Sequence, residues 1–124
     1  MTPENFYSEL VDQFPTLKER LDIWDTDSPH MNMEEFADYT KDQLLTGNLS
    51  ELKRCFQFQE DRIEQADDLL INCMTVSYCE ALLLGGLEET EIEKAISLMG
   101  PRLLKLYRDY EDYYNNLGTR SQQN

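Results

Sequence analysis

Residues 22–42 (DIWDTDSPHMNMEEFADYTKD) hold a dense cluster of acidic side chains, with seven carboxylates and one lysine. Carboxylates at this density could bind a metal ion, transfer protons in a reaction or attract a basic partner protein. Each of these uses requires a different arrangement of the side chains, so the sequence can be tested for each in turn.

The residues after Asp25 do not fit a calcium-binding loop. An EF-hand loop that began there would need glycine at its sixth position and glutamate at its twelfth, where this chain has His30 and Phe36. A transition-metal site is also unsupported, because His30 is the only histidine and no HExxH or paired Glu-x-x-His motif is present. We therefore expect no bound metal and no other cofactor, and we interpret His30 as a structural or merely exposed loop residue.

Catalytic signatures are missing from the sequence. Acid–base catalysis by two carboxylates requires one of them to be desolvated, whereas the acidic residues of 34–42 are expected on a solvated helix face. The sequence has no GxSxG motif, no cysteine in a basic context and no glycine-rich phosphate loop after a strand. We therefore predict that the protein is not an enzyme and has no small-molecule substrate.

The charge of the whole chain points to a basic partner. It has 25 acidic and 11 basic residues, a formal net charge of −14, which disfavours binding to nucleic acid or to anionic membranes. A second acidic region, from Glu60 to Glu93, holds ten acids and one base. Some of these acids suit helix N-termini, and a merely well-solvated surface is the simpler alternative.

The sequence also bears on the cellular compartment. The first residues, MTPENFYSEL, do not resemble a signal peptide, and no apolar run is long enough to cross a bilayer. The three cysteines, Cys55, Cys73 and Cys79, fit neither a disulfide framework nor a zinc finger. We expect a soluble, reduced, cytoplasmic protein.

Apolar residues recur at helical spacing along the chain, and no stretch alternates with period two, which predicts an all-α fold. We expect one domain over residues 1–117, a bundle or short α-solenoid-like array of six to seven antiparallel helices, followed by a disordered polar tail over 118–124. Capping residues and prolines place the helix starts at Thr2-Pro3, Pro15, Asn32, Asn48, Asp67 or Asp68, Thr90 and Pro101.

Two of these helices have distinctive patterns. Residues 69–84 are apolar around nearly the whole circumference, which predicts a helix buried in the middle of the domain. Its expected core residues include Leu70, Met74, Val76 and Leu83. In the last helix, the tyrosines at 107, 110 and 114 form a stripe that could be either the margin of the core or a binding surface.

Three stretches resemble a known family: FPTLKERL (14–21), SPH (28–30) and SLMGPRLLKL (97–106). Through them the chain resembles a family of small, acidic, all-helical bacterial proteins of uncharacterised function. Proteins of this kind are similar to the immunity proteins of bacterial toxin systems. The resemblance implies a helical protein that binds a toxin, and it transfers no catalytic residue to this chain.

The leading hypothesis is therefore a cytoplasmic immunity or inhibitor protein. It would neutralise a toxin that has a basic active-site cleft by direct binding through an acidic surface. The alternative is a helical adaptor or scaffold module that binds a basic peptide or protein. The predicted partner-binding residues are one aromatic anchor, Trp24, and the acids Asp25, Asp27, Glu34, Glu35, Asp38 and Asp42.

Overall fold

The computed structural model describes residues 1–22 and 27–123, together with the side chains of all of these except 83, 84 and 117–123. The described chain is all-α, as predicted, and contains no strand. Its α-helices are α1 (Pro3–Gln13), α2 (Pro29–Leu45), α3 (Leu49–Glu60), α4 (Asp68–Asn72), α5 (Glu80–Leu84), α6 (Glu89–Leu98) and α7 (Pro101–Gln123). A π-helical segment, Cys73–Cys79, joins α4 to α5, and single 3-10 turns occupy Pro15–Leu17 and Ile63–Gln65.

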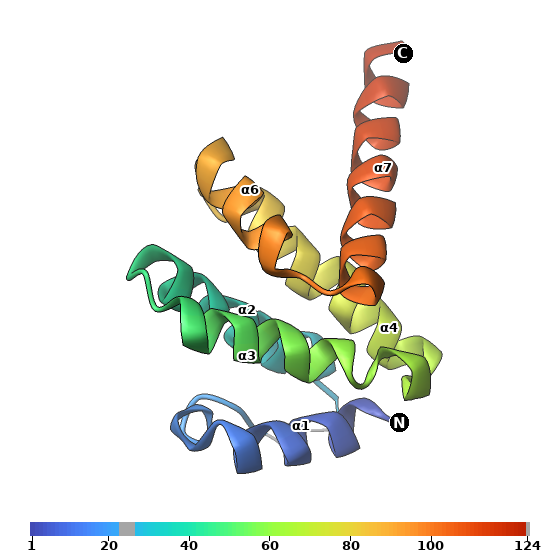
Figure 1. Cartoon of the computed structure of the whole chain (residues 1–124). Coiled ribbons are helices and arrows are strands. Elements are labelled where there is room, and N and C mark those ends of the chain that lie inside the picture. The colour runs from blue at the N-terminus through green and yellow to red at the C-terminus, as the bar shows by residue number, and fades with distance from the viewer. Residues whose placement is uncertain (23–26, 124) are drawn as a thin grey trace.

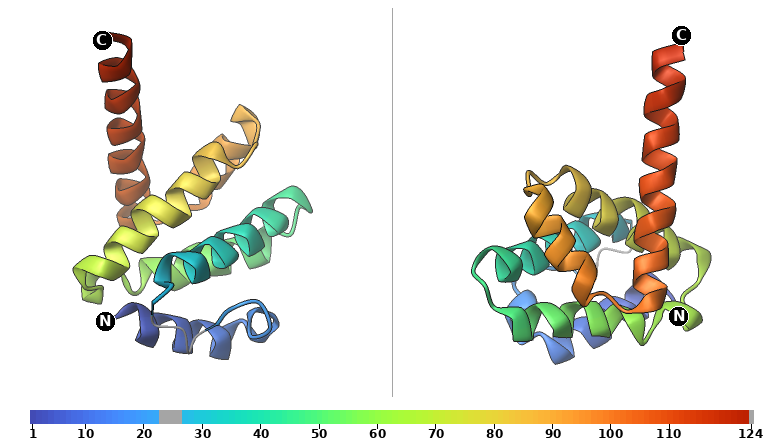
Figure 2. Two further views of the ribbon diagram at one scale, coloured as in Figure 1. Left: turned by 180° about the vertical axis from the view of Figure 1, so that it is seen from behind. Right: turned by 45° about the horizontal axis from the view of Figure 1, so that its top comes forward.

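The helices lie in layers, with α7 projecting from one side. In Figures 1 and 2, α1 covers one face of the α2–α3 pair, and the rod formed by α4, the π-helical segment and α5 covers the other. The C-terminal half of α7 extends beyond the rest of the domain in every view. Among the described residues, no helix has both the length and the apolar content that a membrane span requires. The prediction of a disordered tail over 118–124 stays a prediction.

Four helices, α1, α3, α4 and α7, begin where the sequence predicts. The Thr2 hydroxyl accepts a hydrogen bond from the Asn5 amide at 3.2 Å, with proline at the first helical position. The side chain of Asn48 caps α3, and that of Asp67 caps α4 by accepting from the Leu70 amide at 2.8 Å. The first three starts are predictable because each cap bonds an amide only three residues away, and the start of α7 is predictable because Pro101 takes the first helical position.

Two predicted helix starts are wrong. Asn32 does not cap α2, which begins at Pro29; its buried amide instead bonds both backbone groups of Asp22 at 2.9 Å. Thr90 does not cap α6, because Glu88 takes that position in a capping box with Glu91. At α6 a neighbouring polar side chain takes the capping position. At α2 the expected capping side chain makes a tertiary contact instead.

The prediction of a short helix after Pro15 is also wrong. Only one 3-10 turn follows, Pro15–Leu17, although Leu17 and Leu21 are buried as an apolar stripe would require. The chain reaches the core here without regular helix, because the turn bonds of Leu17, Lys18 and Arg20 are of the three-residue kind.

The π-helical segment keeps one face of the central rod in the core. Leu70, Met74, Tyr78 and Leu82 recur every four residues and are each at most 2% exposed. In an uninterrupted α-helix, a repeat of four would rotate by about 40° per turn and carry the last of these residues out of the core. The wider turns of Cys73–Cys79 absorb that rotation.

The central rod is not buried on all sides, which corrects the sequence interpretation. Leu69 is 48% exposed and Val76, predicted to be a core residue, is 37% exposed. Leu83 lies outside the described side chains. The rod packs mainly against α2 and α7, so the side of the rod that faces neither helix stays open to solvent.

A buried carboxylate fixes the start of α7. Glu60, at the end of α3, is 5% exposed and accepts hydrogen bonds from the backbone amides of Arg102 at 3.1 Å and Leu103 at 3.0 Å. The Arg102 guanidinium lies 3.4 Å from the same carboxylate. Gly100 permits this approach, because a Cβ there would lie 2.3 Å from a Glu60 oxygen. Glu60 thus caps a helix that begins at Pro101, in a distant part of the chain.

The tyrosine stripe of α7 divides along its length. Tyr107 and Tyr110 are 1% and 7% exposed, whereas Tyr113 and Tyr114 are 59% and 44% exposed. Tyr110 and Tyr114 stack with their ring centroids 6.4 Å apart. The stripe therefore begins in the core and ends on the projecting part of the helix.

The cysteines are buried, and we expect them to be chemically inert. Burial raises the pKa of Cys55 and of Cys79 to about 12, and the thiolate is the reactive form. At pH 8, alkylation of these two thiols in the native protein should be slower than in the unfolded chain by roughly a thousandfold. Mass spectrometry of iodoacetamide-treated native and urea-unfolded protein checks this. Equal rates in the two samples would contradict the burial of both thiols.

Candidate functional site

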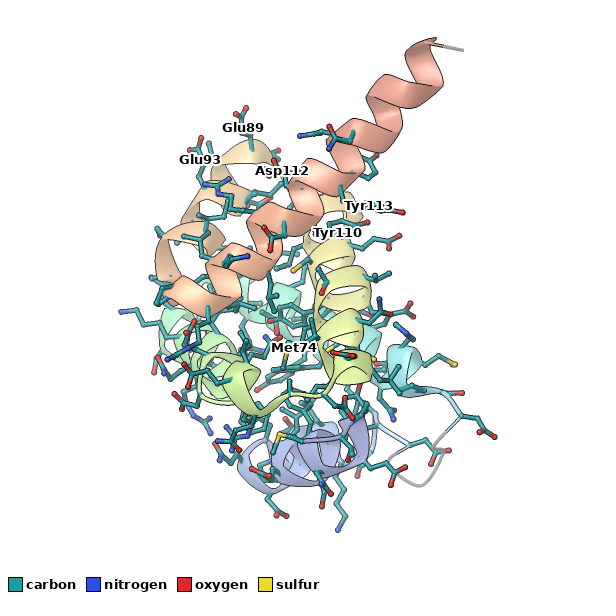
Figure 3. All side chains as sticks on the ribbon, turned by 90° about the vertical axis from the view of Figure 1, so that its right-hand side faces the viewer. Met74, Glu89, Glu93, Tyr110, Asp112 and Tyr113 are labelled. Atoms are coloured by element: carbon teal, nitrogen blue, oxygen red, sulfur yellow. The ribbon has the colours of Figure 1, made fainter. Side chains whose placement is uncertain are left out.

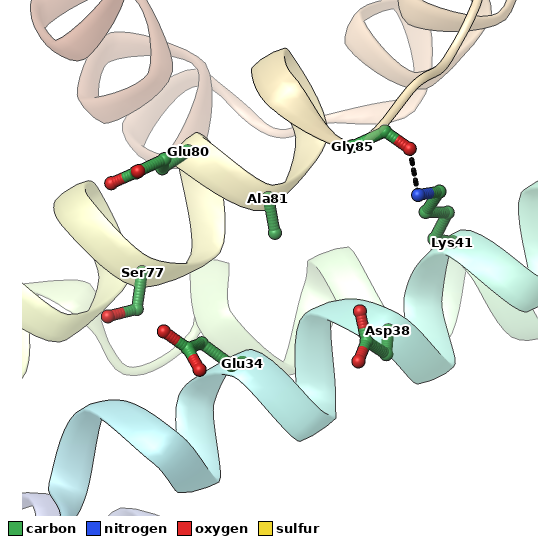
Figure 4. A pocket seen from close by; sticks show the side chains of 7 residues that line it. All are labelled: Glu34, Asp38, Lys41, Ser77, Glu80, Ala81 and Gly85. Carbon is green, nitrogen blue, oxygen red and sulfur yellow. Dashed lines mark hydrogen bonds between the residues drawn. The ribbon is translucent and has the colours of Figure 1, made fainter.

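An acidic cleft lies between α2 and the rod that runs from the π-helical segment to α5. It has a volume of about 300 Å³. Figure 4 shows its seven lining residues, with one stripe of α2 facing the opposite wall. The α2 wall is Glu34, Asp38 and Lys41, and the opposite wall is Ser77, Glu80, Ala81 and Gly85.

Helix geometry puts the α2 residues of the cleft on one stripe. Glu34, Asp38 and Lys41 are four and three residues apart, so they lie above one another on one side of the helix. Phe36 and Ala37, between them in sequence, point into the core and are at most 1% exposed. The packing of α2 therefore determines which of its acids face the cleft.

Lys41 forms a hydrogen bond at the end of the cleft. Its ammonium group donates a hydrogen bond to the carbonyl oxygen of Gly85, the C-cap residue that follows α5 (Figure 4). A Cβ at Gly85 would lie 2.8 Å from this ammonium group, so glycine allows the close contact. The positive charge of Lys41 is thus used to satisfy a helix C-terminus.

The carboxylates of Glu34 and Asp38 are the available charges of the cleft. Both residues are exposed, and neither carboxylate makes a hydrogen bond or an ion pair within the described ranges 1–22 and 27–123. Like charges four residues apart on a helix destabilise it by a few tenths of a kcal/mol. The third carboxylate, Glu80, also faces Tyr110 of α7, where burial first and then this carboxylate raise the pKa of the phenol to about 12.

Two polar contacts hold the walls of the cleft together. The His30 Nδ1 atom lies 2.6 Å from the Ser77 hydroxyl, and Tyr78 donates a hydrogen bond of 2.7 Å to the Thr40 hydroxyl. Both contacts join α2 to the π-helical segment. His30 is in the first turn of α2 rather than in the preceding loop, which corrects its sequence-based placement.

The other acids of α2 face a different side, where they meet a base. Arg20 lies 3.2 Å from Glu35 and 3.8 Å from Asp42. The sequence interpretation placed the acidic residues of 34–42 on one solvated helix face, but the structure divides them between Arg20 and the cleft. Arg20 is fifteen residues from Glu35 in sequence, so no local pattern indicates this pairing.

Three predicted contact residues remain: two lie outside the described residues, and one lies just before α2. Trp24 and Asp25 lie outside the described residues. Asp27 is exposed just before the start of α2. The sequence thus identified two acids of the cleft, Glu34 and Asp38, and missed Lys41 and Glu80, whose roles depend on contacts between distant segments.

The chemistry of the cleft is that of an anionic binding surface. Among the described residues, no three histidine, cysteine, aspartate or glutamate side chains come together as metal ligands. The cleft offers carboxylate oxygens, the Ser77 hydroxyl and a wide opening to solvent. Such a surface can hold lysine or arginine side chains through charge-assisted hydrogen bonds.

Comparison with known proteins identifies one family. A family model described as "Domain of unknown function (DUF7674)" matches residues 7–115, which include every helix from α2 to α6 and most of α1 and α7. No curated protein and no solved structure matches the chain.

Proposed function

We propose a function for this chain, which belongs to the DUF7674 family of domains of unknown function: it binds a basic protein partner through the acidic cleft. The partner is a toxin whose active-site cleft is basic, and binding blocks that cleft. The protein would then act as an immunity protein in the cytoplasm of the cell that makes it.

One observation carries the proposal: Glu34 and Asp38 present carboxylates without a partner in the described chain, on the wall of a cleft. A net charge of −14 adds a long-range attraction for a basic protein. Complementary charge accelerates association, because it steers the two proteins before they touch. Toxins that act on nucleic acid need basic clefts, so an acidic inhibitor is electrostatically matched to them.

The two acidic groups of α2 give a matched pair of variants. In Glu34→Gln/Asp38→Asn, two charges are removed from the cleft, whereas Glu35→Gln/Asp42→Asn removes the same charge from the side that Arg20 already partly neutralises. We expect the first variant to associate about tenfold more slowly with the toxin domain that it neutralises, with little change in dissociation. The second variant should remain within about twofold of the wild type.

Association kinetics at low and moderate salt, beside a growth-rescue assay, measure these differences. Added salt should slow the wild type more than the cleft variant, because screening acts on the charges that the variant has lost. Equal association rates for both double variants, with full protection of cells, would show that the partner binds elsewhere.

A further inference from the structure

A second concave surface lies on the other side of the domain, between α6 and α7. The two helices diverge from the Gly100-Pro101 junction, as Figure 1 shows. The groove between them has a volume of about 600 Å³. It is lined by Leu87, Glu89, Ile92, Glu93 and Ile96 on one wall, and by Tyr107, Arg108 and Glu111 on the other.

The α6 wall of the groove is apolar and only partly covered. Ala95 is the single buried residue of α6, whereas Ile92 and Ile96 are half-buried beside it. Leu87, just before the helix, is half-buried as well. An apolar stripe that the domain leaves incompletely covered can gain stability from a further apolar surface.

A buried polar atom at the opposite wall lacks a partner. Tyr107 is 1% exposed, and its hydroxyl makes no hydrogen bond in the part of the chain that the structure describes. Burial, followed by the nearby Glu111 carboxylate, raises the pKa of this phenol to about 12, so it stays a neutral donor. A buried hydroxyl without an acceptor is destabilising, and a ligand that supplies a carbonyl oxygen would remove that cost.

Acidic side chains surround the groove. Glu89 and Glu93 project from the free end of α6 in Figure 3, away from the side of α7 that carries Tyr110 and Tyr113. Glu111 stands on the α7 wall. Arg108, the base among the lining residues, lies 3.2 Å from Glu111 and is therefore partly neutralised. The rim thus favours a cationic occupant.

We propose that this groove binds the C-terminal end of an amphipathic, basic helix of a partner protein. The apolar side chains of that helix cover Ile92 and Ile96, and its lysine or arginine side chains pair with Glu89 and Glu93. The last turn of a helix has free carbonyl groups and favours basic residues, so it supplies both the acceptor for Tyr107 and the positive charge. The proposal concerns helices other than those of the acidic cleft and does not rest on the function proposed for it.

The probe is a fluorescein-labelled amphipathic helix made of leucine and lysine, titrated into the full-length protein and followed by anisotropy. We expect saturable binding at one helix per chain, and no binding of a leucine–glutamate helix with the same pattern. Ile92→Lys should weaken binding about tenfold or more, because it removes apolar contact and adds a repulsive charge. Leu69→Lys makes the same charge change at an exposed residue outside the groove and should bind like the wild type.

A second variant tests the unpaired hydroxyl. Tyr107→Phe should lower affinity about fivefold while leaving the melting temperature unchanged or raised, because it removes a donor that only the ligand satisfies. Glu34→Gln/Asp38→Asn should keep full affinity, which separates this site from the acidic cleft. Equal weakening by Ile92→Lys and Leu69→Lys would overturn the proposal in favour of unspecific attraction. A wild-type dimer that Ile92→Lys dissociates would also overturn it, by assigning the groove to a second copy of the chain.

Discussion

Replacing Met74 with aspartate should abolish cooperative folding of the domain. Met74 lies in the π-helical segment, is 0% exposed and belongs to the buried face of the central rod. An ionised carboxylate there would have no partner, and its desolvation costs several kcal/mol or more. That cost is comparable with the whole stability of a domain of this size, about 5–15 kcal/mol. Far-UV and near-UV circular dichroism during thermal unfolding measure the outcome.

Val76→Asp is the control for this prediction, two residues along the same segment. Val76 is 37% exposed, so a carboxylate at this position stays hydrated and the melting temperature should change by only a few degrees. A Met74→Asp variant that melts like the wild type would contradict the burial of this face.

Glu60→Ala should destabilise the domain by about 3 kcal/mol. The change leaves the amides of Arg102 and Leu103 without their acceptor and opens a void beneath Gly100. It also removes the partner that holds the Arg102 guanidinium against α3. Urea denaturation should show a lower midpoint, and the melting temperature should fall by roughly 10 °C.

Glu64→Ala provides the matched comparison, because Glu64 also bonds Arg102 but its side chain is 70% exposed. Exposed ion pairs contribute about 0–1 kcal/mol, so this variant should stay close to the wild type. Gly100→Ala should resemble Glu60→Ala, since the added Cβ would displace the buried carboxylate. Similar stabilities for Glu60→Ala and Glu64→Ala would mean that Glu60 does not act as the cap of α7.

The parts of the fold that could be predicted from sequence depend on neighbouring residues. Thr2, Asn48 and Asp67 bond amides three positions ahead, and glycine and proline mark the junction at 100–101. Asn32 shows the limit of this approach. Its sequence pattern is that of a cap, but its side chain bonds Asp22, which only the folded chain brings near.

The candidate site was predictable only in part, for the same reason. The sequence indicated that the acids of 34–42 lie on a solvated helix face, and Glu34 and Asp38 do line the cleft. It gave no sign that Arg20 would pair with Glu35 and Asp42, or that Lys41 would bond Gly85. The Glu60 cap likewise joins segments about forty residues apart in sequence. The unpaired Tyr107 hydroxyl follows from burial, which the local sequence does not indicate.

The π-helical segment makes the rod tolerant of a change in length at one point, because it holds one residue more than ordinary α-helical turns would need there. Deleting one exposed residue of the segment, such as Val76, would restore ordinary α-helical turns and keep the later residues of the rod near their present positions relative to α4. Leu82 would then stay in the core, and Glu80 and Ala81 would stay on the wall of the cleft. A family member that is one residue shorter in this segment should therefore need no compensating substitutions on either side of the gap.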